Sequence, residues 1–175
     1  AATAERVLKA AGVWDKIEPV YQTFEEAAQS LVLGQVDAEF TVIAYPAPAI
    51  NQIAVKVPVR LIPVPDDVIK KLHDQGYPFY VKVVIPKGTY NGMTEDAQTV
   101  AVKSTLVVHK DLPDEAVYEI TKILYENIEE LAKAHQVAKQ IDINHAFDGL
   151  MIPLHPGAVK YYEEHGITVP EDLKG

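Results

Sequence analysis

Strand-like and helix-like segments alternate over about the first 75 residues, and this alternation limits the possible folds more than any other feature of the sequence. Ala38–Ala44 (AEFTVIA) is rich in the β-branched residues that favour strands. Thr23 and Glu26 have capping-box spacing, and hydrophobic residues at helical intervals follow them. The expected elements come in this order: the strand Glu18–Gln22, a helix capped at Thr23 and stopped by Gly34, the strand Ala38–Ala44, a helix whose first turn contains Pro46, the strand Val59–Val64 and the helix Asp66–Gln75. This order predicts an α/β layer with mainly parallel strands.

The pattern changes after about residue 76. Tyr77–Tyr90 is extended, aromatic and interrupted by Pro and Gly, as is typical of a connector between lobes. Thr99–Val108 predicts a long strand. Pro113 begins the longest predicted helix, with a buried stripe at Val117, Ile120, Leu124, Ile128 and Leu131. Shorter helices are expected over Asn144–Leu150 and after His155. We therefore predict one α/β ligand-binding lobe over residues 1–82, and a hinge connector with part of a second lobe over 83–175.

Composition excludes several classes of function. The 175 residues include 16 Lys and Arg against 25 Asp and Glu, for a net charge of −9. A chain this acidic repels phosphate backbones, so we expect no nucleic-acid partner. There is no cysteine for a disulfide, a thiolate metal site or a cysteine nucleophile. No apolar run approaches the roughly 20 residues of a membrane span. The first residues do not have the pattern of a signal peptide, so we expect that any export signal was removed or never present.

The segment Ala44-Tyr45-Pro46-Ala47 is the candidate ligand site, because a predicted strand ends there and a helix begins. Ligands of open α/β sheets gather at such ends. Tyr45, Tyr80 and Tyr90 lie at strand ends or in the connector, where a phenol offers a flat apolar wall and one hydrogen bond. The alternative is that the prolines shape a turn and the tyrosines fill the seam between lobes. From the residues alone, we favour this packing alternative for each of them.

Other polar residues are weaker candidates. The histidines of the second half have no metal-site spacing, and we assign His135 and His165 to helix ends. No metal and no cofactor are expected. Asp142, His145 and Asp148 are possible acid/base groups, although a capped short helix explains the same residues. Arg60 has the chemistry to clamp a ligand carboxylate, but a surface ion pair is the simpler interpretation.

Several runs resemble the TAXI-type solute-binding proteins of TRAP transporters. The most specific are the connector IPKGTYNGM and the tail IPLHPGAVKYYEEHGI, and FEEAAQSLVLGQVDAEFTVIAYPAPAI adds to them. The resemblance covers nearly the whole chain in the same order. It implies a type II periplasmic-binding-protein-like fold, with two lobes of mainly parallel sheets joined by a hinge. Family members begin with a glycine-rich segment, so we expect this sequence to be a C-terminal portion that lacks the N-terminal part of the first lobe and leaves the second lobe incomplete.

The resemblance also implies a function. It indicates a periplasmic receptor, with its signal peptide removed, that captures a small organic acid or amino acid such as glutamate or glutamine. The receptor would deliver this ligand to the TRAP permease, which an ion gradient drives. Thr3, where the family has Asn, joins Ala44–Ala47, Tyr80 and Tyr90 as an expected ligand contact. The alternative is an enzyme on the same fold that uses Asp142, His145 and Asp148.

Overall fold

Two antiparallel strands, β1 (Tyr80–Ile85) and β2 (Ala97–Val102), form the sheet of the first of two units. The computed structural model describes residues 2–175, and the chain divides into the two units between Val102 and Lys103. Tyr80 pairs with Val102 and Ile85 with Ala97. The predicted connector thus contributes β1 to the first unit. The predicted lobe boundary at residue 82 therefore falls within this strand.

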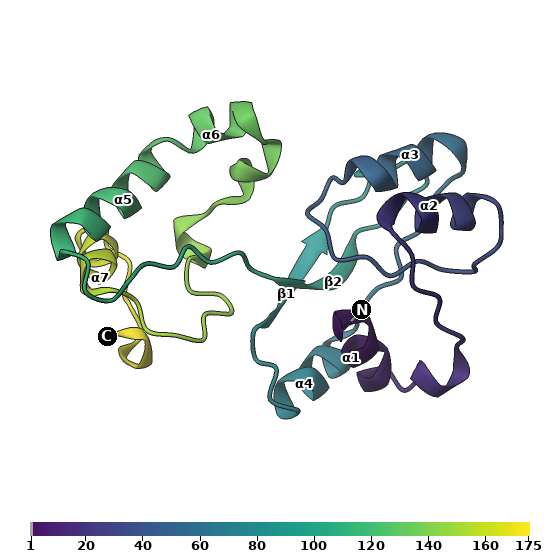
Figure 1. Cartoon of the computed structure of the whole chain (residues 1–175), viewed down its shortest axis with the longest axis horizontal. Coiled ribbons are helices and arrows are strands. Elements are labelled where there is room, and N and C mark those ends of the chain that lie inside the picture. Colours follow the sequence, from purple (N-terminus) through teal and green to yellow (C-terminus); the bar gives the residue numbers. More distant parts are fainter. Residues whose placement is uncertain (1) are drawn as a thin grey trace. The chain divides into compact units, whose positions relative to one another are not determined.

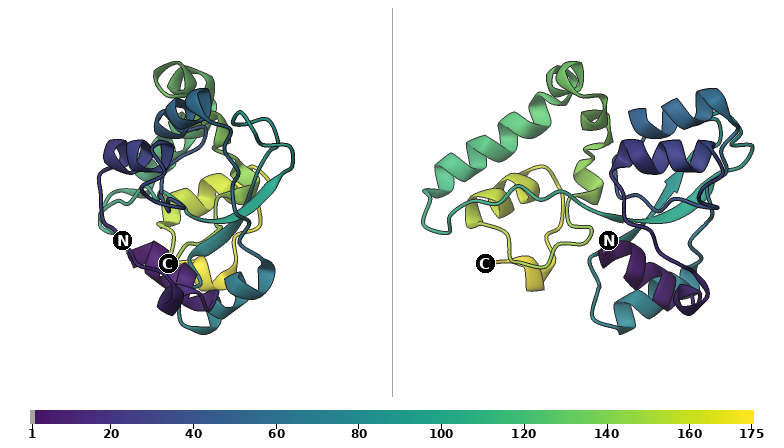
Figure 2. Two further views of the ribbon diagram at one scale, coloured as in Figure 1. Left: turned by 90° about the vertical axis from the view of Figure 1, so that its right-hand side faces the viewer. Right: turned by 45° about the vertical axis from the view of Figure 1, so that its right-hand side comes forward.

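Four α-helices pack around this strand pair. Helices α2 and α3 contact each other on one side of it, whereas α1 contacts α4 on the other, and α4 also contacts β1 (Figures 1 and 2). The helices and the short 3₁₀ helix η1 of this unit are α1 (Ala2–Ala10), η1 (Trp14–Lys16), α2 (Phe24–Val32), α3 (Pro48–Lys56) and α4 (Asp66–Asp74).

The first unit has two hydrophobic clusters, one toward each end of β1. Tyr80 begins the strand and packs with Val7 of α1 and Leu72 of α4. Ile85 ends the strand and packs against the second cluster. The buried members of that second cluster are Ala54, Tyr90, Met93 and Ala97. Each end of β1 thereby packs in a different hydrophobic cluster.

Local sequence signals position most helices. The predicted capping box is confirmed: the Thr23 hydroxyl accepts from the Glu26 backbone N–H at 3.3 Å, and Glu26 accepts from the Thr23 N–H at 2.9 Å. The position predicted for Pro46 is wrong by two residues. Helix α3 begins at Pro48 with Ala47 as its N-cap, and the Tyr45–Pro46 peptide bond is cis.

The mixed helix and strand composition is confirmed, but the parallel sheets are not present within residues 2–175. The segments Glu18–Gln22 and Ala38–Ala44 have no regular secondary structure. Val59 and Val64 donate single backbone hydrogen bonds of 2.9 Å to Asn91 and Gln98, too few for a strand. β-Branched residues favour an extended backbone, but a β-strand also needs a neighbouring strand with which its backbone can form regular hydrogen bonds. The described backbone of 38–44 makes no hydrogen bond to another backbone group.

The second unit is helical. The predicted long helix is broken at Asn127, whose side-chain amide donates to the Ile123 carbonyl at 2.8 Å. The predicted stripe holds at Val117, which is buried, but Ile120 and Leu131 are exposed. The predicted strand Thr99–Val108 ends at Val102. The helices of this unit are α5 (Asp114–Glu126), α6 (Ile128–Ala134), η2 (Gln136–Gln140), η3 (Ile143–His145), α7 (Pro156–Glu164) and η4 (Glu171–Leu173).

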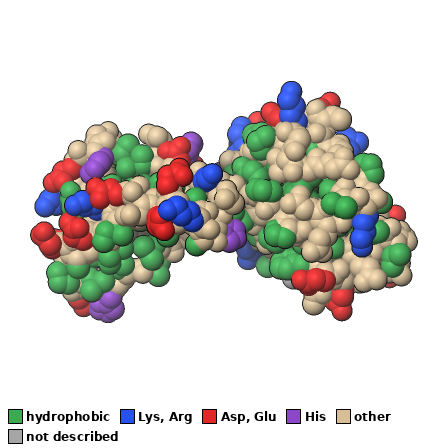
Figure 3. All heavy atoms as spheres, turned by 90° about the horizontal axis from the view of Figure 1, so that it is seen from above, with side chains coloured by type: hydrophobic (Ala, Val, Ile, Leu, Met, Phe, Trp, Pro, Cys, Tyr) green, Lys and Arg blue, Asp and Glu red, His purple; other side chains and the backbone are tan. Residues whose placement is uncertain are grey.

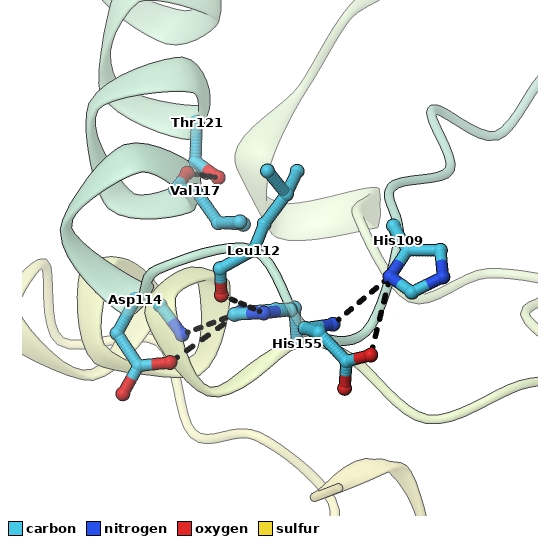
Figure 4. A network of polar contacts seen from close by, with 8 residues as sticks. His109, Leu112, Asp114, Val117, Thr121 and His155 are labelled. Atoms are coloured by element: carbon cyan, nitrogen blue, oxygen red, sulfur yellow. Dashed lines mark hydrogen bonds and ion pairs between the residues drawn. The ribbon is translucent and has the colours of Figure 1, made fainter.

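The tail motif His155-Pro156-Gly157 joins α7 to the start of α5. His155 Nδ1 accepts from the Gly157 N–H at 3.2 Å, while its Nε2 lies 3.1 Å from the Leu112 carbonyl oxygen (Figure 4). In this arrangement Nδ1 is the acceptor, and Nε2 is placed to donate to the Leu112 carbonyl. A Cβ on Gly157 would overlap the Asp114 carbonyl oxygen, so glycine permits the close contact of the two helices. The family-like tail therefore has a structural role.

Hydrophobic side chains are also found on the surface of both units (Figure 3). Examples are Val20, Tyr21 and Val55 in the first unit, and Leu106 and Val107 in the second. Among the helices described here, none combines the length and the apolar character that crossing a bilayer requires.

Candidate functional site

The turn at Ala47 is fixed by Tyr90. Ala47 is the N-cap of α3 and is fully buried, and its backbone N–H donates to the Tyr90 hydroxyl at 2.8 Å. The Ala47 N–H precedes the helix and has no partner within it, so the phenol supplies the acceptor for this buried donor. Tyr90 is itself 4% exposed, and burial raises the pKa of its hydroxyl, partly offset by the hydrogen bond from Ala47. The structure thus brings two of the predicted site residues together.

The neighbouring predicted residues are more accessible. Ala44 and Pro46 are exposed, and Tyr45 is half-buried with its hydroxyl 3.4 Å from the Val84 carbonyl oxygen of β1. The turn therefore presents the small apolar side chains of Ala44 and Pro46, and one phenol, between the start of α3 and the strand pair. This surface suits contact with the apolar part of a small ligand.

Thr3 and Tyr80 belong to a different part of the first unit. Thr3 lies in the first turn of α1 and is half-buried. Tyr80 is 1% exposed in the cluster formed by α1, α4 and β1, with its ring centroid 4.7 Å from that of Phe79. Neither residue is in the cluster that contains Tyr90.

Glu39 and Thr41 are polar residues that the sequence reasoning did not consider. Each has a buried side-chain oxygen without a hydrogen-bond partner among the described residues. Burial raises the pKa of the Glu39 carboxyl, because the charged form loses solvation. The spacing of these two residues is the signal that could have indicated them. In an extended segment, Glu39 and Thr41 share one side, whereas Phe40 and Val42 lie on the other. Buried oxygens of this kind normally bind a donor.

The histidines cap turns and helices. His135 Nδ1 accepts from the Val137 N–H at 3.3 Å, and His165 Nδ1 lies 2.7 Å from the Tyr161 carbonyl oxygen. His109 occupies a similar position, with Nδ1 accepting from the Asp111 N–H at 3.3 Å (Figure 4). Within residues 2–175, no three His, Asp or Glu side chains form a group suited to a metal ion.

The proposed acid/base residues lie close together around the short helix η3. His145 Nδ1 is 3.0 Å from Asp148 Oδ2, and both side chains are largely exposed. Asp142 Oδ1 accepts two hydrogen bonds of 2.9 Å from Asn144, which lower the pKa of this carboxyl. These contacts are the ones that a capped turn makes.

The family model described as the NMT1-like family matches residues 1–166 of the chain. It is a family of solute-binding proteins of the periplasmic-binding type, whose members typically act outside the cytoplasm.

Proposed function

The chain belongs to the NMT1-like family of solute-binding proteins, and from this membership we propose that it is a receptor of the TAXI type. Its ligand is a small organic acid or an amino acid, with glutamate and glutamine as the first candidates. It delivers this ligand in the periplasm to the membrane subunits of a TRAP permease. The observation that carries the proposal is the match over residues 1–166, which includes the connector segment and all but the last residue of the tail segment that carry the specific family resemblance.

The turn before α3 supports a binding role. Tyr90 accepts from the Ala47 N–H, so the backbone at Ala47 is held in place before any ligand arrives. A preformed surface loses less conformational entropy when a ligand binds. Tyr45 then adds a half-buried ring beside this backbone. The proposed contacts are Tyr45 and the exposed residues Ala44 and Pro46.

The proposal is a receptor and not an enzyme. The His145–Asp148 pair is the observation that favours the alternative, because an aspartate beside an imidazole can orient it as a general base. In this chain Asp142 caps η3 and Asp148 pairs with the histidine across it, so both aspartates support the turn itself.

A thermal-shift experiment with chemical analysis of the ligand tests the two functions. Glutamate, glutamine and small dicarboxylates are added singly, and each ligand is recovered afterwards and identified by mass spectrometry. A receptor gains stability by about 2.7 kcal/mol when the free ligand is at 100 times Kd, and it returns the ligand unchanged. A product that forms with wild type and disappears in His145→Ala would establish the enzyme instead.

A further inference from the structure

A pocket of about 300 Å³ lies between two segments of the first unit. One wall is formed by Arg60, Leu61 and Pro63, and the other by residues 92–97. This volume is at the lower end of the range for small-molecule sites, which suits a ligand of amino-acid size. Of the residues in these walls, only Arg60 was considered as a ligand contact from the sequence, where a surface ion pair was the simpler interpretation.

The two walls are held in fixed positions. The Val59 N–H donates to the Asn91 carbonyl, and the Val64 N–H donates to the Gln98 carbonyl, both at 2.9 Å. The Gln98 side chain returns a third bond of 2.9 Å to the Val64 carbonyl. These bonds span the pocket walls at both ends, so the pocket is formed in advance of any ligand.

Glycine and buried side chains complete this rigid frame. A Cβ on Gly92 would lie 2.7 Å from the Val59 nitrogen, so only glycine allows this separation of the walls. Met93 and Ala97 line the pocket and are 8% and 4% exposed. Both also pack in the cluster that contains Tyr90, which connects the pocket to the turn at Ala47.

The pocket is lined by an arginine and two acidic residues that form no ion pair with one another. Within residues 2–175, no carboxylate is within ion-pair distance of the Arg60 guanidinium, and no cation is within that distance of Glu95. The surface ion pair expected for Arg60 is therefore not formed. Asp96 adds a second carboxylate to the wall of Glu95, and its Oδ1 accepts from the Lys87 N–H at 2.8 Å. The pocket offers a cation on one wall and anions on the other.

We propose that this pocket binds the charged head of an α-amino acid, with Arg60 on its carboxylate and Glu95 and Asp96 facing its ammonium group. The inference rests on the proposed receptor function and narrows its ligand class. Guanidinium binds carboxylate through two parallel hydrogen bonds, which gives both affinity and orientation. A dicarboxylate without an amine would place its second negative charge near Glu95 and Asp96, so the site discriminates against it.

Titration calorimetry with L-glutamine and with succinate tests this assignment. Wild type is compared with Arg60→Gln, and with Lys56→Gln as a control that removes one positive charge from an exposed position in the same unit. We expect wild type to bind glutamine more tightly than succinate. Arg60→Gln weakens glutamine binding at least tenfold, Arg60→Lys weakens it less, and Lys56→Gln leaves it within about twofold because its effect is only long-range and screened. Circular dichroism confirms that each variant is folded.

The outcomes separate this inference from the receptor function. If Arg60→Gln and Lys56→Gln bind glutamine equally well, Arg60 is not the anchor, although the receptor function stands. If succinate binds more tightly than glutamine, the assignment to amino acids is wrong. If wild type binds neither compound nor any related acid, both the pocket assignment and the proposed function are overturned.

Discussion

Replacing Tyr90 with phenylalanine isolates the contact that fixes the turn at Ala47. The change removes one hydroxyl and keeps the ring in its cluster with Met93 and Ala97. The Ala47 N–H is then buried without its acceptor, which costs about 1–3 kcal/mol. The hydroxyl is itself desolvated in the native state, so its removal returns part of this amount. We expect a net loss of about 1–2 kcal/mol in the free energy of unfolding.

Urea unfolding followed by circular dichroism measures this loss. The midpoint should fall while the dependence on denaturant stays unchanged, because the same surface is exposed on unfolding. A loss of this size lowers the melting temperature of a domain of about 100 residues by roughly 4–16 °C. Tyr21→Phe is the matched control, since Tyr21 is 68% exposed. Equal stability of the two variants would mean that the Tyr90 hydroxyl does not hold the turn.

Three further predictions concern glycines and a phenol. Gly92→Ala should destabilise the protein more than Gly88→Ala in urea unfolding: both glycines have positive φ (98° and 78°), but only at Gly92 does the new Cβ meet backbone. Gly157→Ala should lower the melting temperature, even though alanine is the better helix former by about 1 kcal/mol, because its Cβ overlaps the start of α5. The Tyr118 phenol donates to Glu164 at 2.7 Å, which raises the pKa of Tyr118 to about 12. The contribution of this hydrogen bond to folding stability is thus complete below pH 10 and is lost as the pH rises toward 12. Glu164→Gln should lower the pH midpoint at which the Tyr118 tyrosinate absorbance appears.

Local signals in the sequence were sufficient where the partners are close along the chain. Thr23 and Glu26 satisfy each other within one helical turn, so their pattern determines the start of α2. Pro113 marks the start of α5 for the same reason. The break at Asn127 was missed, because the hydrophobic spacing continues across it and the amide competes with the helix from within.

Contacts between residues that are far apart in the sequence could not be predicted from local patterns. Ala38–Ala44 has the composition of a strand, but composition does not supply the neighbour that a ladder needs. The hydrogen bond from Ala47 to Tyr90 joins residues 43 positions apart, and nothing near either residue indicates it. The same holds for the pocket, where Arg60 meets a segment more than 30 residues later only because Gly92 allows the two to approach.

Titration calorimetry of the wild-type chain with glutamate and glutamine is the most direct test of the receptor proposal. We expect saturable binding of at least one of them. Tyr45→Ala should weaken this binding at least tenfold, equivalent to about 1.4 kcal/mol. Treatment with a chelator should leave the affinity unchanged. Absence of heat with every amino acid and small organic acid, from a chain that circular dichroism shows to be folded, would contradict the proposed function.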